Sequence, residues 1–368
     1  MTGCCMKYVE GLCIDKRFYR TKAGRRYMKR FAKSVGFNKK KAKQYIRRMR
    51  DGCLECFYGG RIVAGKLPKL AGKTIIVIDG NYLLHRNYHS HNLSVRTRKG
   101  PIQIGGTYGF MRDILTFVKK FEPNSVVVAW DGKGKTWRHR LTDKCIEDGI
   151  IKSGYKSNRK KDKDFIKDFG RQKKILRKLL VALGVMQYCK NGVEADDVVG
   201  TYATTISNKR GKCIIISTDK DYYQLLGPLV SIYKPSEDKM YTQSEFMADW
   251  DLAPKSWVLA GALSGDAGDN IIGIRGIGSK TACSLIREYG YENLIKKKID
   301  NKWAKKIRKM KKRVKLAEKL KRIKTNLKVK EIRGMLGVDK QSLRKGFRKL
   351  QFNSLPVLEY CKHFGERD

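Results

Sequence analysis

Short apolar runs alternate with longer stretches of helical pattern from about residue 73 onward. The apolar runs are rich in β-branched residues and are bounded by polar ones: 75–78, 126–129 and 214–216. Such runs are typical of strands buried on both faces of a parallel sheet. Between them lie helical patterns: 108–121, 172–183 and 196–207. The alternation predicts an α/β fold with a mostly parallel central sheet and flanking helices.

Basic segments lie on both sides of this region. Residues 1–72 contain 20 Lys and Arg against 4 Asp and Glu, and residues 291–334 contain 19 against 4. The second segment predicts one or more basic helices over 294–327. We therefore predict a basic helical extension over 1–72, an α/β domain over 73–255 and a basic helical region over 256–368.

The charge balance points to a polyanionic partner. The chain has 82 Lys and Arg and 35 Asp and Glu among 368 residues, a formal net charge of +47. Nucleic acid is the partner that such a charge favours, and an anionic membrane surface is the weaker alternative. No apolar stretch of about 18 residues predicts a membrane span, and the start of the chain lacks a signal-peptide pattern. Ten cysteines in that context predict reduced thiols and a cytoplasmic location.

The N-terminal extension allows more than one interpretation. Residues 31–46 resemble a helix-turn-helix weakly, and a basic helical hairpin is the favoured reading. Cys53 and Cys56 have the spacing of metal ligands, and with Cys4, Cys5 and Cys13 they offer a Cys₄ zinc site. The second pair lacks the same spacing, so we favour an extension that adds affinity for DNA.

Acidic residues cluster at the ends of the predicted strands. Asp79, Asp131 and Asp219 each follow an apolar run. The carboxyl ends of parallel strands meet at one edge of the sheet, where ligands bind. Further acids stand at the start of a predicted helix and in a glycine-rich turn. The complete set is Asp79, Asp131, Glu194, Asp196, Asp197, Asp219, Asp221, Asp266 and Asp269.

Taken singly, each acid fits helix capping or turn chemistry. Nine carboxylates at one edge, however, could not all stay ionised without cations. Oxygen ligands without accompanying His or Cys favour Mg²⁺ or Mn²⁺ over Zn²⁺. Two such ions are the usual arrangement for hydrolysis of phosphodiesters.

Residues 273–282, GIRGIGSKTA, form a helix-hairpin-helix signature. The glycines allow a tight turn in which backbone N–H groups approach a phosphate. The following helix offers its positive N-terminus, and Lys280 adds charge.

Together these motifs resemble the structure-specific 5′ nucleases, which include bacteriophage flap endonucleases and 5′-exonucleases and the 5′ nuclease domain of DNA polymerase I. The resemblance covers 73–290 well and continues loosely to Tyr360. Its motifs are 78–81 (IDGN), 107–109 (TYG), 130–138 (WDGKGKTWR), 155–159 (YKSNR), 192–197 (GVEADD), 217–221 (STDKD) and 265–282. The resemblance implies a PIN-like 5′ nuclease fold with a C-terminal helix-hairpin-helix region.

The resemblance also implies roles for the acidic and basic residues. The first ion would be held by Asp79, Asp131, Glu194 and Asp196, with Asp197 beside them. The second would be held by Asp221, Asp219, Asp266 and Asp269. Near the scissile bond, Lys156 would approach the phosphate, Arg138 and Arg159 would contact phosphates, and Tyr155 would stack on a base, with core packing as its alternative. The hairpin that grips duplex DNA would comprise Gly276, Ile277, Gly278, Ser279, Lys280 and Thr281, with K⁺ as a candidate ion.

A helical arch near 155–180 is a further implication, and 143–151 looks inserted relative to the family pattern. We expect a monomeric Mg²⁺-dependent 5′–3′ exonuclease and flap endonuclease, of phage or other viral origin, that acts on DNA flaps, nicks, gaps or RNA–DNA hybrids. One alternative is a DNA-binding protein with a decayed active site, against which the intact acids argue. Another is a PIN-type ribonuclease, which would lack the helix-hairpin-helix.

Overall fold

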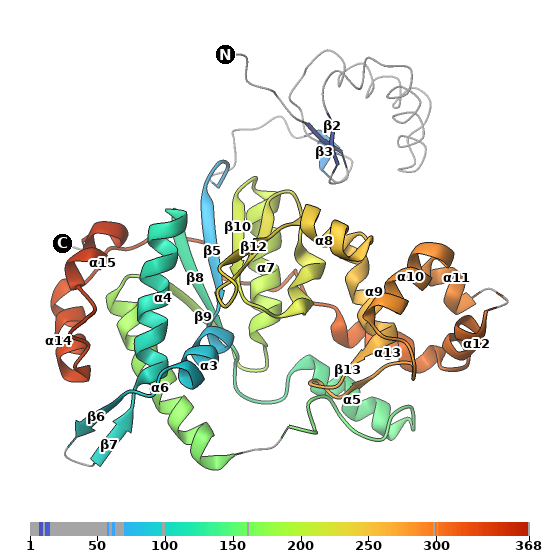
Figure 1. Ribbon diagram of the computed structural model, residues 1–368, viewed down its shortest axis with the longest axis horizontal. Coiled ribbons are helices and arrows are strands. Elements are labelled where there is room, and N and C mark those ends of the chain that lie inside the picture. Colours follow the sequence, from blue (N-terminus) through green and yellow to red (C-terminus); the bar gives the residue numbers. More distant parts are fainter. Residues whose placement is uncertain are drawn as a thin grey trace. The chain divides into compact units, whose positions relative to one another are not determined.

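The structure, a computed structural model, describes residues 70–97, 100–159, 162–296, 299 and 301–366 and four short strands nearer the N-terminus (Figure 1). The chain divides into two compact units, 1–68 and 69–368. In the first unit, β1 (Lys7–Val9) pairs antiparallel with β2 (Leu12–Ile14), and β3 (Phe57–Tyr58) with β4 (Arg61–Ile62). The predicted helices over 31–46 and the side chains of the candidate zinc cysteines lie outside the described residues.

A six-stranded sheet forms the centre of the second unit, in the order β12-β11-β10-β5-β8-β9. Its three central strands are those predicted from the apolar runs: β10 (Lys212–Ile216), β5 (Thr74–Asp79) and β8 (Ser125–Trp130). The outer strands are β9 (Met186–Cys189), β11 (Val230–Lys234) and β12 (Lys239–Tyr241). All pairings are parallel except that of β11 with β12, which confirms the predicted mostly parallel sheet.

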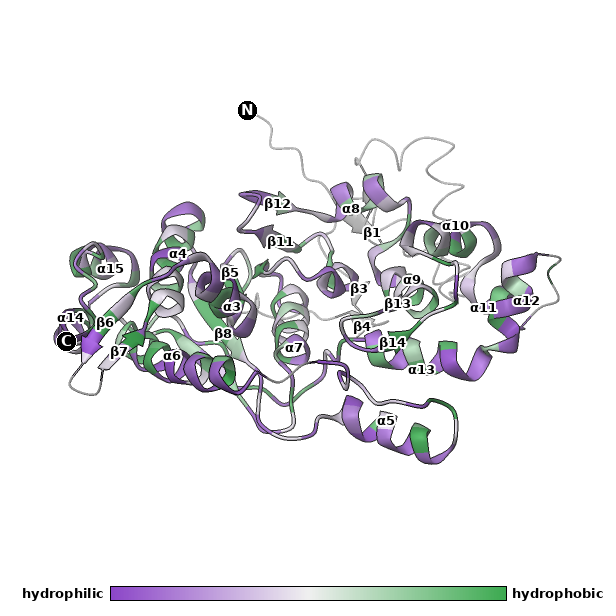
Figure 2. Ribbon diagram, turned by 60° about the horizontal axis from the view of Figure 1, so that its bottom comes forward, coloured by the Kyte–Doolittle hydropathy of each residue, from purple (hydrophilic) through white to green (hydrophobic). Residues whose placement is uncertain are grey.

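Both faces of the sheet are covered, because alternate side chains of each strand enter different cores. Ile76 and Ile78 of β5 join one core, which contains α4 (Gly105–Phe121) and α6 (Lys163–Ala182). Ile75 and Val77 join the other, which contains α7 (Ala195–Asn208). In Figure 2 the central strand β8 is largely hydrophobic in colour, whereas much of α5 (Trp137–Glu147) is hydrophilic.

The remaining elements of this unit flank the sheet. Helix α3 (Gly80–Ser90) follows β5, and the hairpin of β6 (Ser94–Thr97) and β7 (Gly100–Gln103) leads into α4. After β10 comes the short 3₁₀ helix η2 (Lys220–Leu225). Helix α8 (Gln243–Trp250) and η3 (Pro254–Ser256) then lead to a helical region.

The helical region is built on α9 (Trp257–Ser264), against which α10 (Ser279–Tyr289) and α13 (Lys311–Lys321) pack. Between α9 and α10 lies a small hairpin of β13 (Gly265–Asp266) and β14 (Ile271–Ile272). The predicted basic helices over 294–327 correspond to α11 (Tyr291–Lys296), α12 (Lys302–Lys309) and α13, and the helical structure ends at Lys321.

The last two helices do not belong to this helical region, although the sequence placed 256–368 together. Helices α14 (Lys340–Leu350) and α15 (Val357–Phe364) pack on α6 and α4 at the other end of the sheet (Figure 1). Tyr360 donates a hydrogen bond to the carbonyl of Met111 in α4 at 2.7 Å. Apolar side chains of these helices pack into the core of the sheet. The basic composition of the segment gave no indication of this packing.

The predicted arch over 155–180 also needs correction. From Gln172 onward, α6 is part of the core, with Leu176, Leu179 and Leu180 buried. Gln172 accepts a hydrogen bond from the backbone N–H of Thr107 at 3.2 Å, which fixes this half of the helix against α4. Only the part before Gln172 is left as a candidate for an arch.

Candidate functional site: a carboxylate-rich edge of the sheet

The predicted acids converge because the ends of neighbouring parallel strands deliver them to one edge. Asp79 ends β5 and accepts a hydrogen bond from the N–H of Tyr82 at 3.0 Å, capping α3. Asp131 directly follows β8, and Asp219 follows β10 and caps η2 through the N–H of Asp221 at 2.8 Å. Asp196 lies in the first turn of α7.

We define the first cluster as Asp79, Asp131, Asp196 and Asp219. The hydroxyl of Tyr222 lies 3.0 Å from Oδ2 of Asp79 and 2.8 Å from Oδ1 of Asp196, so it joins two of these carboxylates. Oδ1 of Asp131 accepts a hydrogen bond from the N–H of Ala195 at 2.7 Å. These contacts fix the carboxylates, but a phenol and an amide neutralise none of their charge.

The first cluster carries uncompensated negative charge. Within the described residues, no salt bridge reaches any of its four carboxylates. Burial and the neighbouring Asp131 raise the pKa of Asp79 to about 7. Burial, Asp219 and Asp79 raise the pKa of Asp196 well above its usual range. Such shifts indicate a site that needs cations to hold its carboxylates ionised at neutral pH.

We define the second cluster as Asp221, Asp266 and Asp269, each of which offers a carboxylate oxygen within 4.8 Å of the others. Lys321 forms ion pairs with Asp221 and with Asp266, the latter at 2.7 Å. Burial raises the pKa of Asp221 to about 7 although Lys321 acts in the opposite direction. Burial would lower the pKa of Lys321, but Asp221 and Asp266 together raise it above its usual range.

The donor set fits hard divalent cations. Both clusters offer carboxylate oxygens, which Mg²⁺ and Mn²⁺ prefer, and neither contains a His or Cys ligand of the kind that Zn²⁺ favours. The residues that would hold ions are therefore those of the first cluster and those of the second.

Three predicted roles are contradicted by the positions of the side chains. Arg138 is only 2% exposed and lies between two acids, with Nη2 2.9 Å from Oδ1 of Asp197 and Nη1 3.2 Å from Oε1 of Glu194. It therefore cannot contact a phosphate here. Asp197, fully buried, also accepts hydrogen bonds from Trp137 Nε1 and from the N–H of Lys324, so it serves the fold and does not face the first cluster.

Tyr155 is the third correction, because its ring is buried and cannot stack on a base. The residue is 4% exposed, and its hydroxyl lies 3.1 Å from Oε2 of Glu194 and 2.9 Å from Oδ2 of Asp269. The core-packing alternative is thus the correct one. Tyr155 fixes the two acids on either side of Lys156.

Lys156 points at the site from a strained backbone. Its φ is +55°, a left-handed conformation that costs a residue with a side chain about 1 kcal/mol or more. Its N–H donates to the carbonyl of Asp269 at 2.9 Å, and its Nζ lies 2.7 Å from Oε2 of Glu194. Lys156 and Arg138 lower the pKa of Glu194 to about 2, although burial acts against them. Glu194 is therefore paired with two basic side chains, and its role as a ligand of the first ion stays a prediction.

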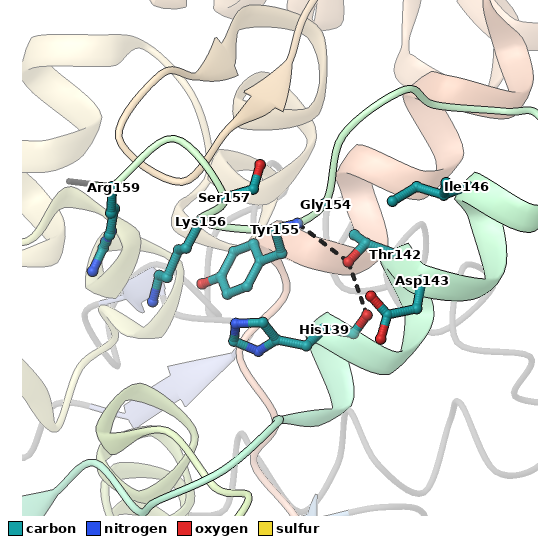
Figure 3. Close-up of a pocket in the computed structure, with 9 residues that line it drawn as sticks. All are labelled: His139, Thr142, Asp143, Ile146, Gly154, Tyr155, Lys156, Ser157 and Arg159. Atoms are coloured by element: carbon teal, nitrogen blue, oxygen red, sulfur yellow. Dashed lines mark hydrogen bonds between the residues drawn. The ribbon is translucent and has the colours of Figure 1, made fainter. Parts of the chain in front are cut away.

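An open pocket of about 610 Å³ adjoins Lys156. Figure 3 shows the side chains of Lys156 and Arg159 extending in the same direction, beside the ring of Tyr155 and opposite His139 of α5. Arg159 is exposed and pairs with Asp269 at 2.8 Å. Two cations beside a carboxylate-rich edge form a suitable contact for a phosphate.

The helix-hairpin-helix is formed as its sequence predicts. Gly276 has a φ of +89°, and a Cβ there would lie 2.8 Å from the ring of Trp303, so only glycine fits. Ile277 is buried and anchors the turn, which leaves only its backbone for a ligand. Gly278 precedes α10 without a side-chain cap, and Lys280 is exposed, so the helix N-terminus faces outward with a positive charge. Ser279 and Thr281 are half-buried in the first turn.

The sequence analysis missed two residues of the site. Tyr222 carried a weak signal, because it follows Asp221 directly in the 3₁₀ helix. Lys321 carried none, because it is one of many bases in 291–334 and lies far along the chain from its partners.

Family models match most of the second unit. Residues 74–251 match the N-terminal resolvase-like domain of 5′-3′ exonucleases, and residues 252–341 match their C-terminal SAM fold. The 5′-3′ exonuclease of Aquifex aeolicus is 32% identical over 225 residues, which cover 61% of this chain and 73% of that protein. That of Bacillus subtilis is 32% identical over 229 residues, 58% of this chain and 70% of that protein.

Thermostable DNA polymerase I of Thermus filiformis is 34% identical over 226 residues, 61% of this chain. The chain spans only about a quarter of the length of that polymerase. Among solved structures, zinc-bound T5 5′-exonuclease superimposes with a TM-score of 0.56 at 18% identity, covering 78% of this chain and 99% of that one. A T5 flap endonuclease complex with DNA and metal ions gives 0.53 at 18% identity, covering 79% and 100%.

Proposed function

This chain belongs to the 5′-3′ exonuclease family, and from that premise we propose that it is a metal-dependent 5′–3′ exonuclease and flap endonuclease of DNA. The substrate would be a junction between duplex and single strand, such as a 5′ flap or an RNA primer displaced during replication or repair. A T5 flap endonuclease of the same fold was solved with DNA and metal ions, which supports DNA as the partner. The formal charge of +47 supports it independently.

The observation that carries the proposal is the uncompensated first cluster beside the paired second cluster. Asp79 is buried and Asp196 half-buried, and both lie beside the exposed Asp131 and Asp219, so four carboxylates without a salt bridge are costly unless a ligand supplies positive charge. When bound, divalent ions would supply an activated water molecule and stabilise the leaving oxygen. Mg²⁺ is the ion that we propose, with Mn²⁺ as a substitute and K⁺ as a candidate at the hairpin.

The protein's own groups would position the DNA. Lys156 and Arg159 would hold the scissile phosphate next to the carboxylates, since both border the open pocket and both carry charge. The backbone amides at Gly278 and the side chain of Lys280 would bind a phosphate of the duplex. Tyr155 and Arg138 are buried and would not contact DNA. Tyr155 holds Glu194 and Asp269 beside Lys156, and Arg138 holds Glu194.

The direct test uses a DNA flap labelled at its 5′ end, incubated with Mg²⁺ or with EDTA. We expect Mg²⁺-dependent release of the flap near the junction and no release in EDTA. A separate reaction with single-stranded RNA as the substrate tests the ribonuclease alternative. A DNA flap with a blocked 5′ end tests whether cleavage requires a free 5′ end. Cutting that persists in EDTA would contradict the proposal.

A double variant separates cleavage from binding. Asp219→Asn with Asp221→Asn removes one carboxylate from each cluster, so we expect no cleavage but nearly unchanged affinity for DNA. Undiminished cleavage by this variant would refute the role of the carboxylates. Tight binding by the unaltered protein without cleavage in Mg²⁺ or Mn²⁺ would instead favour a DNA-binding protein without activity.

A further inference from the structure

Lys321 places an ammonium group inside the second cluster. It is the last residue of α13 and is only 6% exposed. Its Nζ lies 2.7 Å from Oδ2 of Asp266 and also pairs with Asp221. These are two of the three carboxylates whose oxygens are close enough together to hold an ion. A buried lysine is rare in proteins unless it is paired, and here its partners are the candidate ligands themselves.

The surroundings of Lys321 are built to hold it there. A Cβ at Gly261 of α9 would lie 3.1 Å from Cε and 3.6 Å from Cγ of Lys321, so the absence of a side chain there leaves room for the lysine. The backbone is held on both sides. Arg138 Nε donates to the carbonyl of Leu320 at 2.9 Å, and Gln224 donates to the carbonyl of Lys321 at 3.0 Å.

From this placement we infer that Lys321 is the resident cation of the second cluster and competes with a divalent ion for it. The inference rests on the proposed function, because it concerns the metal site of the same enzyme. An oxygen of Asp221 or Asp266 that accepts from the ammonium is not free to ligate an ion. An ion that enters must also overcome the repulsion of a positive charge a few ångströms away.

The competition has a consequence for the two clusters. The first cluster, without a protein cation, would bind an ion first and more tightly. The second would bind only when Lys321 withdraws its ammonium. Lys321 is thus a positioning residue, which holds Asp221 and Asp266 together in the absence of metal and sets the affinity of the second site.

The test measures Mn²⁺ binding to the full chain by titration calorimetry. We compare the unaltered protein with Lys321→Met, which keeps the length of the side chain and removes its charge. Lys319→Met is the matched control, since it removes the same charge from an exposed position of the same helix. We expect the weaker binding event to strengthen at least tenfold in Lys321→Met and to stay unchanged in Lys319→Met. Equal or weaker binding by a folded Lys321→Met would overturn the inference.

A second measurement needs no variant and so is independent of folding. The unaltered protein is treated with an amine-reactive reagent in EDTA or in Mn²⁺, and labelling of Lys321 is quantified by mass spectrometry. We expect Lys321 to be protected in EDTA and several-fold more reactive in Mn²⁺. Unchanged labelling at saturating Mn²⁺ would overturn the inference.

The outcomes distinguish the two proposals. If one Mn²⁺ binds at the first cluster but Lys321→Met alters nothing, only the competition by Lys321 is refuted. If the protein binds no Mn²⁺ at all, the proposed metal-dependent function is refuted together with it.

Discussion

The nine carboxylates of the site fall into two groups that differ in their charge balance. The four of the first cluster have no salt bridge to a described residue, whereas each of the other five is paired with a lysine or arginine: Glu194, Asp197, Asp221, Asp266 and Asp269. Both groups lie at the same edge of one sheet. The comparison teaches that neighbouring acids differ in whether a protein cation must be displaced before they can ligate a metal ion.

The largest expected effect is on cleavage, and it should separate the two groups. Asp196→Asn removes a ligand for which no protein cation can substitute, so we expect a loss on the order of 10³-fold in single-turnover cleavage of a flap. Asp269→Asn should cost less, because Lys156 keeps its contact with Glu194. Glu237→Gln, in an exposed turn, is the control. Equal losses of cleavage in Asp196→Asn and Asp269→Asn would contradict the distinction between unpaired and paired carboxylates.

The second effect is on stability and concerns the paired group. Arg138→Met leaves Asp197 buried without a cation and removes one of the two cations paired with Glu194, so we expect the free energy of unfolding to fall by about 3–5 kcal/mol. Urea denaturation measures it. Arg140→Met, on the exposed face of the same helix, should stay within about 0.5 kcal/mol of the unaltered protein. A small effect of Arg138→Met would mean that the pairing stabilises little.

The third effect is the dependence of stability on pH, where Asp79 of the first cluster and Glu194 of the paired group have opposite signs. The pKa of Asp79 rises from 3.8 in the unfolded chain to about 7, so the folded state binds more protons between these values. Its contribution, on the order of 4 kcal/mol at most, is present below pH 4 and is lost as pH rises to 7. The pKa of Glu194 falls from 4.5 to about 2, so its contribution is present above pH 4.5 and is lost as pH falls towards 2.

Denaturation of the metal-free protein across pH 2–8 measures both contributions. We expect a maximum of stability near pH 4–5 and a decline towards pH 7 that saturating Mn²⁺ removes. Asp79→Asn should reduce the decline above pH 4, part of which remains because the pKa values of Asp196 and Asp221 are also raised, and should leave the acid side unchanged. A decline of the same size in Asp79→Asn would show that it arises elsewhere.

The smallest effect tests the hairpin, which lies outside both groups. Lys280→Ala should weaken duplex binding a few-fold and reduce the slope of log Kd against log salt by about one, because one phosphate contact is lost. Fluorescence anisotropy at several salt concentrations measures this slope. Lys212 is an exposed lysine at the start of β10, at the end of the strand away from the acidic edge. Lys212→Ala should therefore leave the salt slope unchanged. A similar change in both variants would indicate a general effect of charge.

The sequence was sufficient to predict the sheet and its acidic edge. The runs at 75–78, 126–129 and 214–216 became β5, β8 and β10, and the acids that follow them met as expected. The sequence was insufficient to predict which side chains of the motifs are buried. Arg138 and Tyr155 stand among basic and polar neighbours, so nothing local indicated that each would be enclosed between two acids.

By itself, therefore, the sequence determined the family, the parallel sheet and the convergence of carboxylates, because strand period and strand ends are local properties of the chain. Tertiary structure decided which carboxylates have a protein cation. Arg138 meets Asp197 across 59 positions of sequence, and Lys321 meets Asp266 across 55. Such pairs depend on how α5, α7, α9 and α13 pack, and the large number of basic residues gives no means of selecting the one that enters the site.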